Sequence, residues 1–148
     1  MVYEQDNKNL LTRLHQSPET VRAAERIEDL LSTIGDPDNS RKTVYLSIYS
    51  QVETITLSDE QSVIIGRSDA QTGFKPDVDL MRYNARKHGV SREHACIYLR
   101  GQCLYLMDLG SNNGTFISGH QVMAHDAQPL QSGDVLRLGL LEIHVQIP

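Results

Sequence analysis

The sequence predicts an all-β fold, an antiparallel β-sandwich or barrel, with a short helical extension at its N-terminus. From Thr43 onward, hydrophobic residues recur at every second position in short segments, which is typical of half-buried strands. Turn-forming pairs separate these segments, and no helical pattern comes between them. We therefore divide the chain into an extension and linker, residues 1–42, and one β domain, residues 43–148.

The extension contains one predicted amphipathic helix. Ser17-Pro18-Glu19 is a helix start, since serine caps free amides, proline suits the first helical position and an acid is favoured in the first turn. Gly35 followed by Asp36-Pro37 ends the pattern, and residues 35–42 read as a linker. Apolar residues at three- and four-residue steps form its stripe: Val21, Ala24, Ile27, Leu31 and Ile34. This stripe must be covered by the body of the protein, by another copy through self-association, or by a partner.

The β domain begins with TVYLSIYS, which alternates apolar and polar side chains. The same period continues through TITL, SVIIGR, ACIYLR, QCLYLMDL, TFIS, VLRLG and EIHVQI. Turns are expected at Ser58-Asp59, Arg100-Gly101, Ser118-Gly119 and Ser132-Gly133. Two loops interrupt this rhythm, residues 68–89 and residues 110–115. Loops on a rigid sheet scaffold usually carry the binding groups.

Composition narrows the function classes. The net charge of −5 argues against a nucleic-acid partner. No apolar run approaches the roughly 20 residues that cross a bilayer, and MVYEQDNKNL lacks the pattern of a secretory signal, so we expect a cytoplasmic protein without membrane insertion. Cys96 and Cys103 are expected to be reduced packing residues. Because neither belongs to a close ligand pair, we expect no metal and no cofactor.

Several short motifs carry chemistry. Gly66-Arg67 closes a strand, GVSREHA spans residues 89–95, and DLGSNNGTF spans residues 108–116. The last is rich in Asp, Gly, Ser and Asn, which suit tight turns whose amides and side chains face outward. The stretch RYNARKHGVSR at residues 82–92 carries a local excess of positive charge and contains no acidic residue, and its Arg86 and Lys87 lie just before Ser91. Gly133-Asp134 follows near the end of the chain.

This order of motifs resembles the forkhead-associated (FHA) domain, whose usual pattern is GR, then SxxH, then a GSxNGT-type turn and a GD before the last strands. The resemblance covers about Val44 to Ile147. It implies an eleven-strand FHA-type antiparallel β-sandwich that binds a phosphothreonine-containing protein or peptide through loops at one end. It also implies a non-enzymatic binding module that serves Ser/Thr kinase signalling.

The resemblance assigns five residues to phosphopeptide binding. Arg67 matches the arginine that contacts the phosphate, and Ser91 matches the serine whose hydroxyl donates to it. Asn112 occupies the position after the serine of the second turn, where the family has a small polar side chain near the phosphate. Asn113 matches the asparagine that binds the peptide backbone. Arg92 matches a variable donor position, either a contact to phosphate or peptide or a solvated surface residue. A doubly charged phosphate needs such guanidinium, hydroxyl and amide donors.

Other positions are expected to support the site. His94 matches the histidine that orders the binding loops by hydrogen bonding. Gly114 is expected to supply a backbone geometry that a side chain forbids, and Gly66 to leave room for close packing. Arg86 and Lys87 are expected to attract a phosphorylated partner over longer range, which speeds association.

Three alternatives remain at this point. Ser91, His94 and Asp108 are the residue types of a hydrolytic triad, but Ser and His lie three apart and no GxSxG elbow is present, so we do not expect an enzyme. The chain could instead be a phosphorylation-independent scaffold or oligomerisation protein that uses the FHA fold and the N-terminal helix. A phosphorylated Thr33, with Asp36 three residues on, could also occupy the pocket of its own domain or of a neighbour.

Overall fold

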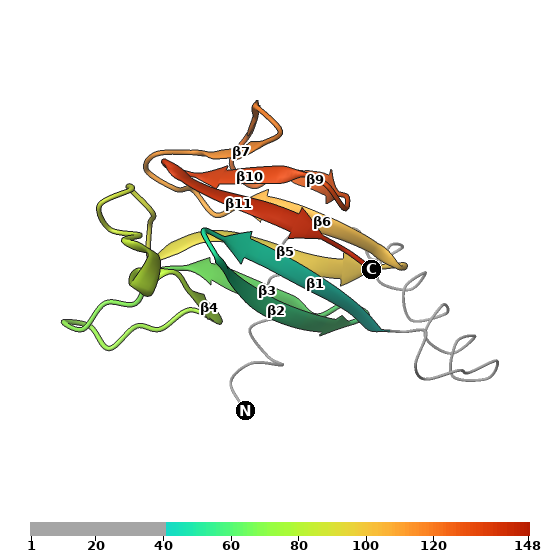
Figure 1. Cartoon of the computed structure of the whole chain (residues 1–148), viewed down its shortest axis with the longest axis horizontal. Coiled ribbons are helices and arrows are strands. Elements are labelled where there is room, and N and C mark those ends of the chain that lie inside the picture. Colours follow the sequence, from blue (N-terminus) through green and yellow to red (C-terminus); the bar gives the residue numbers. More distant parts are fainter. Residues whose placement is uncertain (1–40) are drawn as a thin grey trace.

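The computed structural model describes residues 41–148 as strands arranged in two sheets (Figure 1). One sheet has the order β2-β1-β11-β10-β7-β8 and the other β4-β3-β5-β6-β9. The strands are β1 (Arg41–Ile48), β2 (Gln51–Ser58), β3 (Ser62–Gly66), β4 (Val78–Asp79), β5 (Glu93–Arg100), β6 (Cys103–Asp108), β7 (Thr115–Ile117), β8 (His120–Val122), β9 (Ala127–Leu130), β10 (Val135–Leu138) and β11 (Leu141–Gln146). A short 3-10 helix, η2 (Met81–Tyr83), precedes β5. The predicted all-β sandwich is confirmed, while the predicted helix at residues 18–34 and Thr33 lie outside the described residues.

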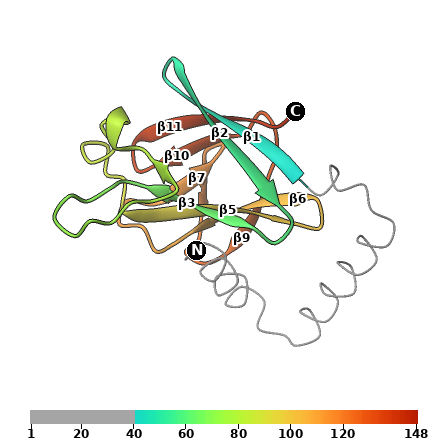
Figure 2. The ribbon, with the colours of Figure 1, turned by 90° about the horizontal axis from the view of Figure 1, so that it is seen from below.

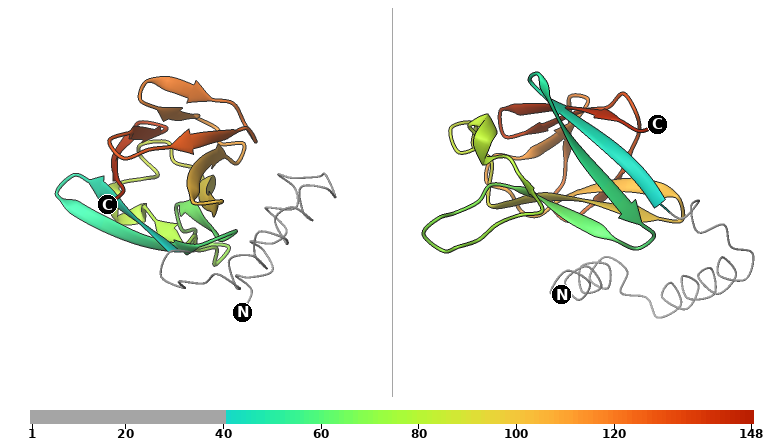
Figure 3. Two further views of the ribbon diagram at one scale, coloured as in Figure 1. Left: turned by 90° about the vertical axis from the view of Figure 1, so that its right-hand side faces the viewer. Right: turned by 60° about the horizontal axis from the view of Figure 1, so that its bottom comes forward.

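The core lies between the two sheets, which Figure 2 shows as two layers and the left view of Figure 3 shows nearly end-on. Alternation along β1 buries Val44, Leu46 and Ile48 completely, while the residues between them are only partly buried. From the other sheet, Ile65 and Ile97 enter the same cluster. The period of two in the sequence is therefore the pattern of one face turned inward.

Three strands have no counterpart among the predicted segments. β4 is only two residues long and pairs in parallel with β3. β8 and β9 are short and largely exposed, and they lie at the edges of their sheets. Pro129 within β9 fits an edge strand, because proline donates no ladder hydrogen bond. Edge strands that bury one residue carry almost no hydrophobic period, so the sequence pattern cannot mark them.

The first strand also extends further than the segment that the apolar alternation predicts. β1 begins at Arg41 rather than Thr43, since Arg41 and Lys42 already pair with Ser58 and Leu57 of β2. These two positions are polar and only partly covered, so they add nothing to the apolar alternation. Register with the neighbouring strand sets where β1 begins.

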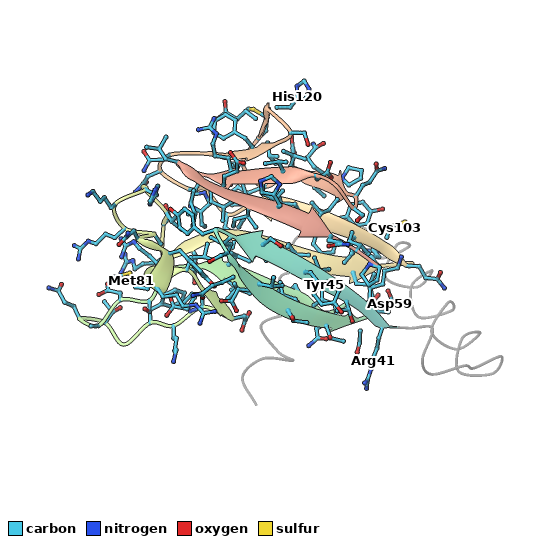
Figure 4. The ribbon with its side chains drawn as sticks, in the orientation of Figure 1. Arg41, Tyr45, Asp59, Met81, Cys103 and His120 are labelled. Atoms are coloured by element: carbon cyan, nitrogen blue, oxygen red, sulfur yellow. The ribbon has the colours of Figure 1, made fainter. Side chains whose placement is uncertain are left out.

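The loops divide between the two ends of the sandwich. The loop from β3 to β4, the η2 segment and the loop from β6 to β7 lie together on the left of Figure 1. Met81 marks this end in Figure 4, while Arg41, Asp59 and Cys103 lie at the other. Within residues 41–148, no helix has the length and apolar character needed to cross a bilayer.

Candidate functional site

The site begins where the end of β3 meets the start of β5. A Cβ built on Gly66 would lie 1.8 Å from the carbonyl oxygen of Arg92, so only glycine fits this crossing. The amide of Arg67, the next residue, donates to that same carbonyl across 3.2 Å. The Arg67 side chain then turns to the loop before β5, where Nε donates to the carbonyl oxygen of Val90 across 2.8 Å. The guanidinium is thus anchored through one nitrogen at the mouth of the loops.

His94 is buried and connects two loops by hydrogen bonds. Its Nδ1 accepts a hydrogen bond from the amide of Ser91 at 2.9 Å, and its Nε2 lies 3.0 Å from the carbonyl oxygen of Gly114. An acceptor at Nδ1 and a carbonyl at Nε2 require the neutral tautomer with the proton on Nε2. Burial lowers the pKa of His94, although the Gly114 carbonyl and the Asp108 carboxylate act in the opposite direction. The neutral ring holds the Ser91 loop against the Gly114 turn.

The turn after β6 is built around the buried carboxylate of Asp108. One oxygen accepts from the amides of Gly110 and Ser111 at 2.9 and 3.1 Å. The other accepts from the hydroxyls of Ser111 and Thr115 at 2.5 and 2.6 Å. Burial works to raise the pKa of Asp108, but these hydrogen bonds outweigh it and the pKa lies below its usual value. An ionised carboxylate therefore fixes the shape of the GSNNGT turn.

Two hydrogen bonds join that turn to the loop before β5. The amide of Asn112 donates to Oγ of Ser91 at 3.2 Å, and Nδ2 of Asn113 donates to the carbonyl oxygen of Gly89 at 2.9 Å. Because Oγ of Ser91 serves as an acceptor here, its own proton remains to be donated elsewhere. Gly89 has a φ of +78°, a backbone conformation in which glycine is unstrained. These bonds place Ser91 and both asparagines within one loop cluster.

A pocket of about 550 Å³ opens at this cluster. Four of the five residues that the sequence assigns to phosphopeptide binding line it: Arg67, Ser91, Arg92 and Asn112. The other lining residues are Thr72, Phe74, Glu93 and Gly110. Asn113 is the fifth assigned residue, and it lies beside the pocket with its amide on Gly89. Residues from β3, β5 and the turn after β6 therefore converge on one space.

Positive charge concentrates around the pocket, but part of the basic run is neutralised. Arg82 pairs with Glu53 of β2, and Arg92 lies 3.3 Å from Asp69. Within the part of the chain that the structure describes, Arg86 and Lys87 form no ion pair. Arg86 lines an adjoining pocket of about 470 Å³ together with Arg67 and Arg92. The sequence run overstated the free charge, because its acidic partners come from other strands and loops.

The residues of the hydrolytic alternative lie close together without forming a triad. Nδ1 of His94 bonds the backbone amide of Ser91 rather than its hydroxyl, and Asp108 bonds the hydroxyls and amides of its own turn. Within residues 41–148, no group of three or more His, Cys, Asp or Glu residues is placed to hold a metal ion. The geometry instead presents hydrogen-bond donors and a guanidinium to a shared pocket, which suits an anionic ligand.

Sequence reasoning missed the part played by Asp108, Thr115 and the pocket wall formed by Thr72 and Phe74. Asp108 is the last residue of the buried strand β6 and precedes Gly110-Ser111, a spacing that would have indicated an Asx-type turn. Thr72 and Phe74 lie in the long loop 68–89, where no period predicts their placement. Only the fold brings that loop to the pocket.

Comparison with known proteins identifies the family of this chain. The sequence pattern of the FHA domain matches residues 63–139, and this chain belongs to the FHA domain family. A domain from a structural and functional analysis of phosphothreonine-dependent FHA domain interactions is 34% identical, covering 70% of this chain and 95% of that chain with a TM-score of 0.54. The FhaA FHA domain, complexed with the intracellular domain of Rv3910, is 35% identical over 70% of this chain and 99% of that chain, with a TM-score of 0.53.

A curated relative extends beyond the domain. Protein FraH of Nostoc sp. is 36% identical over 88 residues, which are 59% of this chain and 29% of that protein. The chain therefore matches less than a third of FraH. Full-length yeast Pml1p, 18% identical with a TM-score of 0.61 over 84% of this chain, shares the fold.

Proposed function

We propose that this chain is a non-enzymatic, phosphothreonine-dependent protein-binding module in Ser/Thr kinase signalling. The single observation that carries the proposal is the shared pocket lined by Arg67, Ser91, Arg92 and Asn112. A guanidinium, a free hydroxyl proton and side-chain amides match the two charges and three acceptor oxygens of a phosphate. The phosphothreonine-dependent interactions of the relative with 34% identity support the same ligand class.

Each of the five residues has a distinct part in the proposed complex. The terminal nitrogens of Arg67 bind phosphate, since Nε is held by Val90. Ser91 donates its hydroxyl proton, and Asn112 and Arg92 line the same pocket. Asn113 binds the peptide backbone beside the phosphothreonine. Arg86 and Lys87 add long-range attraction that speeds association. We also infer a cytoplasmic location, because both cysteines are free thiols and kinase substrates are found there.

The test compares one threonine peptide before and after phosphorylation by isothermal titration calorimetry, after an oriented phosphothreonine library has selected its sequence. We expect binding of the phosphorylated peptide, and weaker binding by at least about 100-fold of the same peptide without phosphate, because a charge-assisted pair is worth about 2 to 4 kcal/mol. A phosphoserine peptide of the same sequence measures the part played by the threonine methyl. Equal affinity for both forms would favour the phosphorylation-independent scaffold instead.

A further inference from the structure

A second hydrophobic cluster lies on the outer face of the five-stranded sheet. Cys96, Tyr98 and Met107 form it, and Tyr105 and Leu109 pack against it. Cys96 pairs across the ladder with Met107, and Tyr98 pairs with Tyr105 at a ring separation of 5.3 Å. The residues between them, such as Ile97, belong to the main core. Since neighbouring side chains of a strand point to opposite faces, this cluster points away from the other sheet.

The outer cluster is buried as deeply as the core. Cys96 is 0% exposed, Tyr98 1% and Met107 2%. A sandwich of two sheets normally leaves the outer faces to solvent and fills them with polar side chains. Among the described residues, the hydrophobic neighbours of this cluster come from β6 and the residue after it, within the same layer. Neighbours in the plane of a sheet cannot cover its face, so another segment must lie over it.

The covered area has clear limits. Ser62 of β3, which pairs with Tyr98, is 1% exposed. By contrast, Ala127 and Pro129 of the edge strand β9 are exposed, and so is Cys103, the first residue of β6. The cover therefore follows β3, β5 and β6, which form one layer in Figure 2. Burial also changes the chemistry of the cluster, because it raises the pKa of Cys96 and the pKa of Tyr98 to about 12.

The described chain begins beside this face. Arg41 pairs with Ser58, and the turn that follows Ser58 leads directly into Ser62, the partner of Tyr98. Asp59 in that turn accepts a hydrogen bond from the amide of Gly101 at 3.0 Å, which fastens the same end of β5. Figure 4 shows Arg41, Asp59 and Cys103 at this end of the molecule. A segment that precedes Arg41 therefore starts beside the turn that joins β2 to Ser62, the partner of Tyr98 in the outer cluster.

We propose that the amphipathic segment 18–34 docks its apolar stripe on the outer face of β3, β5 and β6 of its own chain. The linker and the predicted helix both have suitable lengths. Residues 35–40 span up to about 20 Å when extended, and a helix of 17 residues is about 25 Å long, the scale of the strands beneath it. The stripe of Ile27 and Leu31 supplies the aliphatic surface that Tyr98 and Met107 lack on their outer side.

The experiment measures how fast an uncharged maleimide labels Cys96 in the full chain, with Cys103→Ser removing the exposed thiol. We expect slow labelling in this parent. The pair Ile27→Asp and Leu31→Asp places two charges in the stripe, so labelling should become faster by about tenfold or more as the cover opens. The same variant should lower the pKa of the Tyr98 phenol from about 12, followed by ultraviolet absorbance. Phosphopeptide affinity is a separate readout, since no residue that lines the pocket belongs to the outer cluster.

Matched controls separate docking from other effects. Ser32→Asp adds one such charge beside Leu31 but off the stripe, and it should leave labelling at the parent rate. Far-ultraviolet circular dichroism of the stripe variant should retain the β-sheet spectrum, because neither substitution falls in a strand of the sandwich. Unchanged protection of Cys96 in the stripe variant would overturn the proposal. Protection of the parent that disappears on dilution would also overturn it, since a second copy of the chain would then be the cover.

Discussion

Arg67 is joined to Val90 by a hydrogen bond of 2.8 Å from its Nε atom to the carbonyl oxygen of Val90. This bond uses Nε and leaves the two terminal nitrogens outside it, and Arg67 lines the same pocket as Ser91 and Asn112. A guanidinium held by one edge loses little rotamer freedom when a ligand binds to the other edge. The proposed role of Arg67 in phosphate binding would therefore cost little side-chain entropy.

Replacement of Arg67 should abolish most phosphopeptide binding. For Arg67→Ala we expect a loss of about 2 to 4 kcal/mol, since the phosphate loses its charged partner and its desolvation is no longer compensated. Arg67→Lys should recover only part of this loss, because an ammonium keeps the charge but lacks the planar fork that offers one nitrogen to Val90 and two others to phosphate. Calorimetry with the selected phosphothreonine peptide measures both. Arg82→Ala is the matched control, since that arginine pairs with Glu53 on β2.

The pH dependence of stability should reveal the neutral state of His94. Burial holds its folded pKa below the value of the unfolded chain, so the unfolded state takes up a proton first as the pH falls. The stability that His94 contributes is complete above about pH 6.5 and is lost below it, with a limiting slope of about 1.4 kcal/mol per pH unit. Urea unfolding at a series of pH values between neutral and about pH 5 measures the slope.

The control for this effect is a side chain that does not titrate. His94→Asn keeps an oxygen that can accept from the Ser91 amide, and it should show a shallower dependence in the same pH window. Asp108 does not interfere, because its lowered pKa puts its own protonation at more acidic pH. A slope that is identical in the parent and in His94→Asn would show that His94 is not the titrating group.

The sequence predicted the central strands and the site motifs for physical reasons that the structure makes plain. Strands β1 and β11 bury one face, so their apolar residues carry a strong period. Gly66 and Gly114 stand out because each meets a backbone or steric demand that only a residue without a side chain satisfies. The crossing of Gly66 over Arg92 and the φ of +85° at Gly114 are those demands. A glycine at such a position can therefore be recognised from the sequence motif alone.

The remaining features depend on contacts between distant segments. Asp69 reaches Arg92 and Glu53 reaches Arg82 only after the loops fold back, so the sequence run of basic residues could not show its own neutralisation. The outer cluster of Cys96, Tyr98 and Met107 was equally hidden, because a strand buried on both faces has no period. The ion pairs and the burial of the outer cluster depend on strand register and loop placement, which composition does not predict.

The crossing at Gly66 should tolerate no side chain. Gly66→Ala would bring a Cβ to 1.8 Å from the carbonyl oxygen of Arg92, a backbone atom that cannot move without breaking the pairing of β3 with β5. We expect a loss of about 3 kcal/mol or more in the free energy of unfolding, measured by urea titration. Gly73→Ala is the contrasting control. Gly73 has a φ of +76° and no atom within 4 Å, so only backbone strain of about 1 kcal/mol should appear.

The carboxylate of Asp108 should be as important to the site as the residues that line the pocket. Asp108→Asn would turn an amide group toward donors that now point at two oxygens, which leaves at least one donor of the Ser111 turn without an acceptor. We expect a loss of about 2 to 4 kcal/mol in stability, since the side chain is 3% exposed and water cannot replace the lost bonds. Phosphopeptide affinity should fall as well, because the turn positions Asn112. Asp126→Asn, an exposed carboxylate in the turn before β9, should change neither quantity. If Asp108→Asn left both stability and affinity unchanged, the turn would be held by its backbone rather than by this carboxylate.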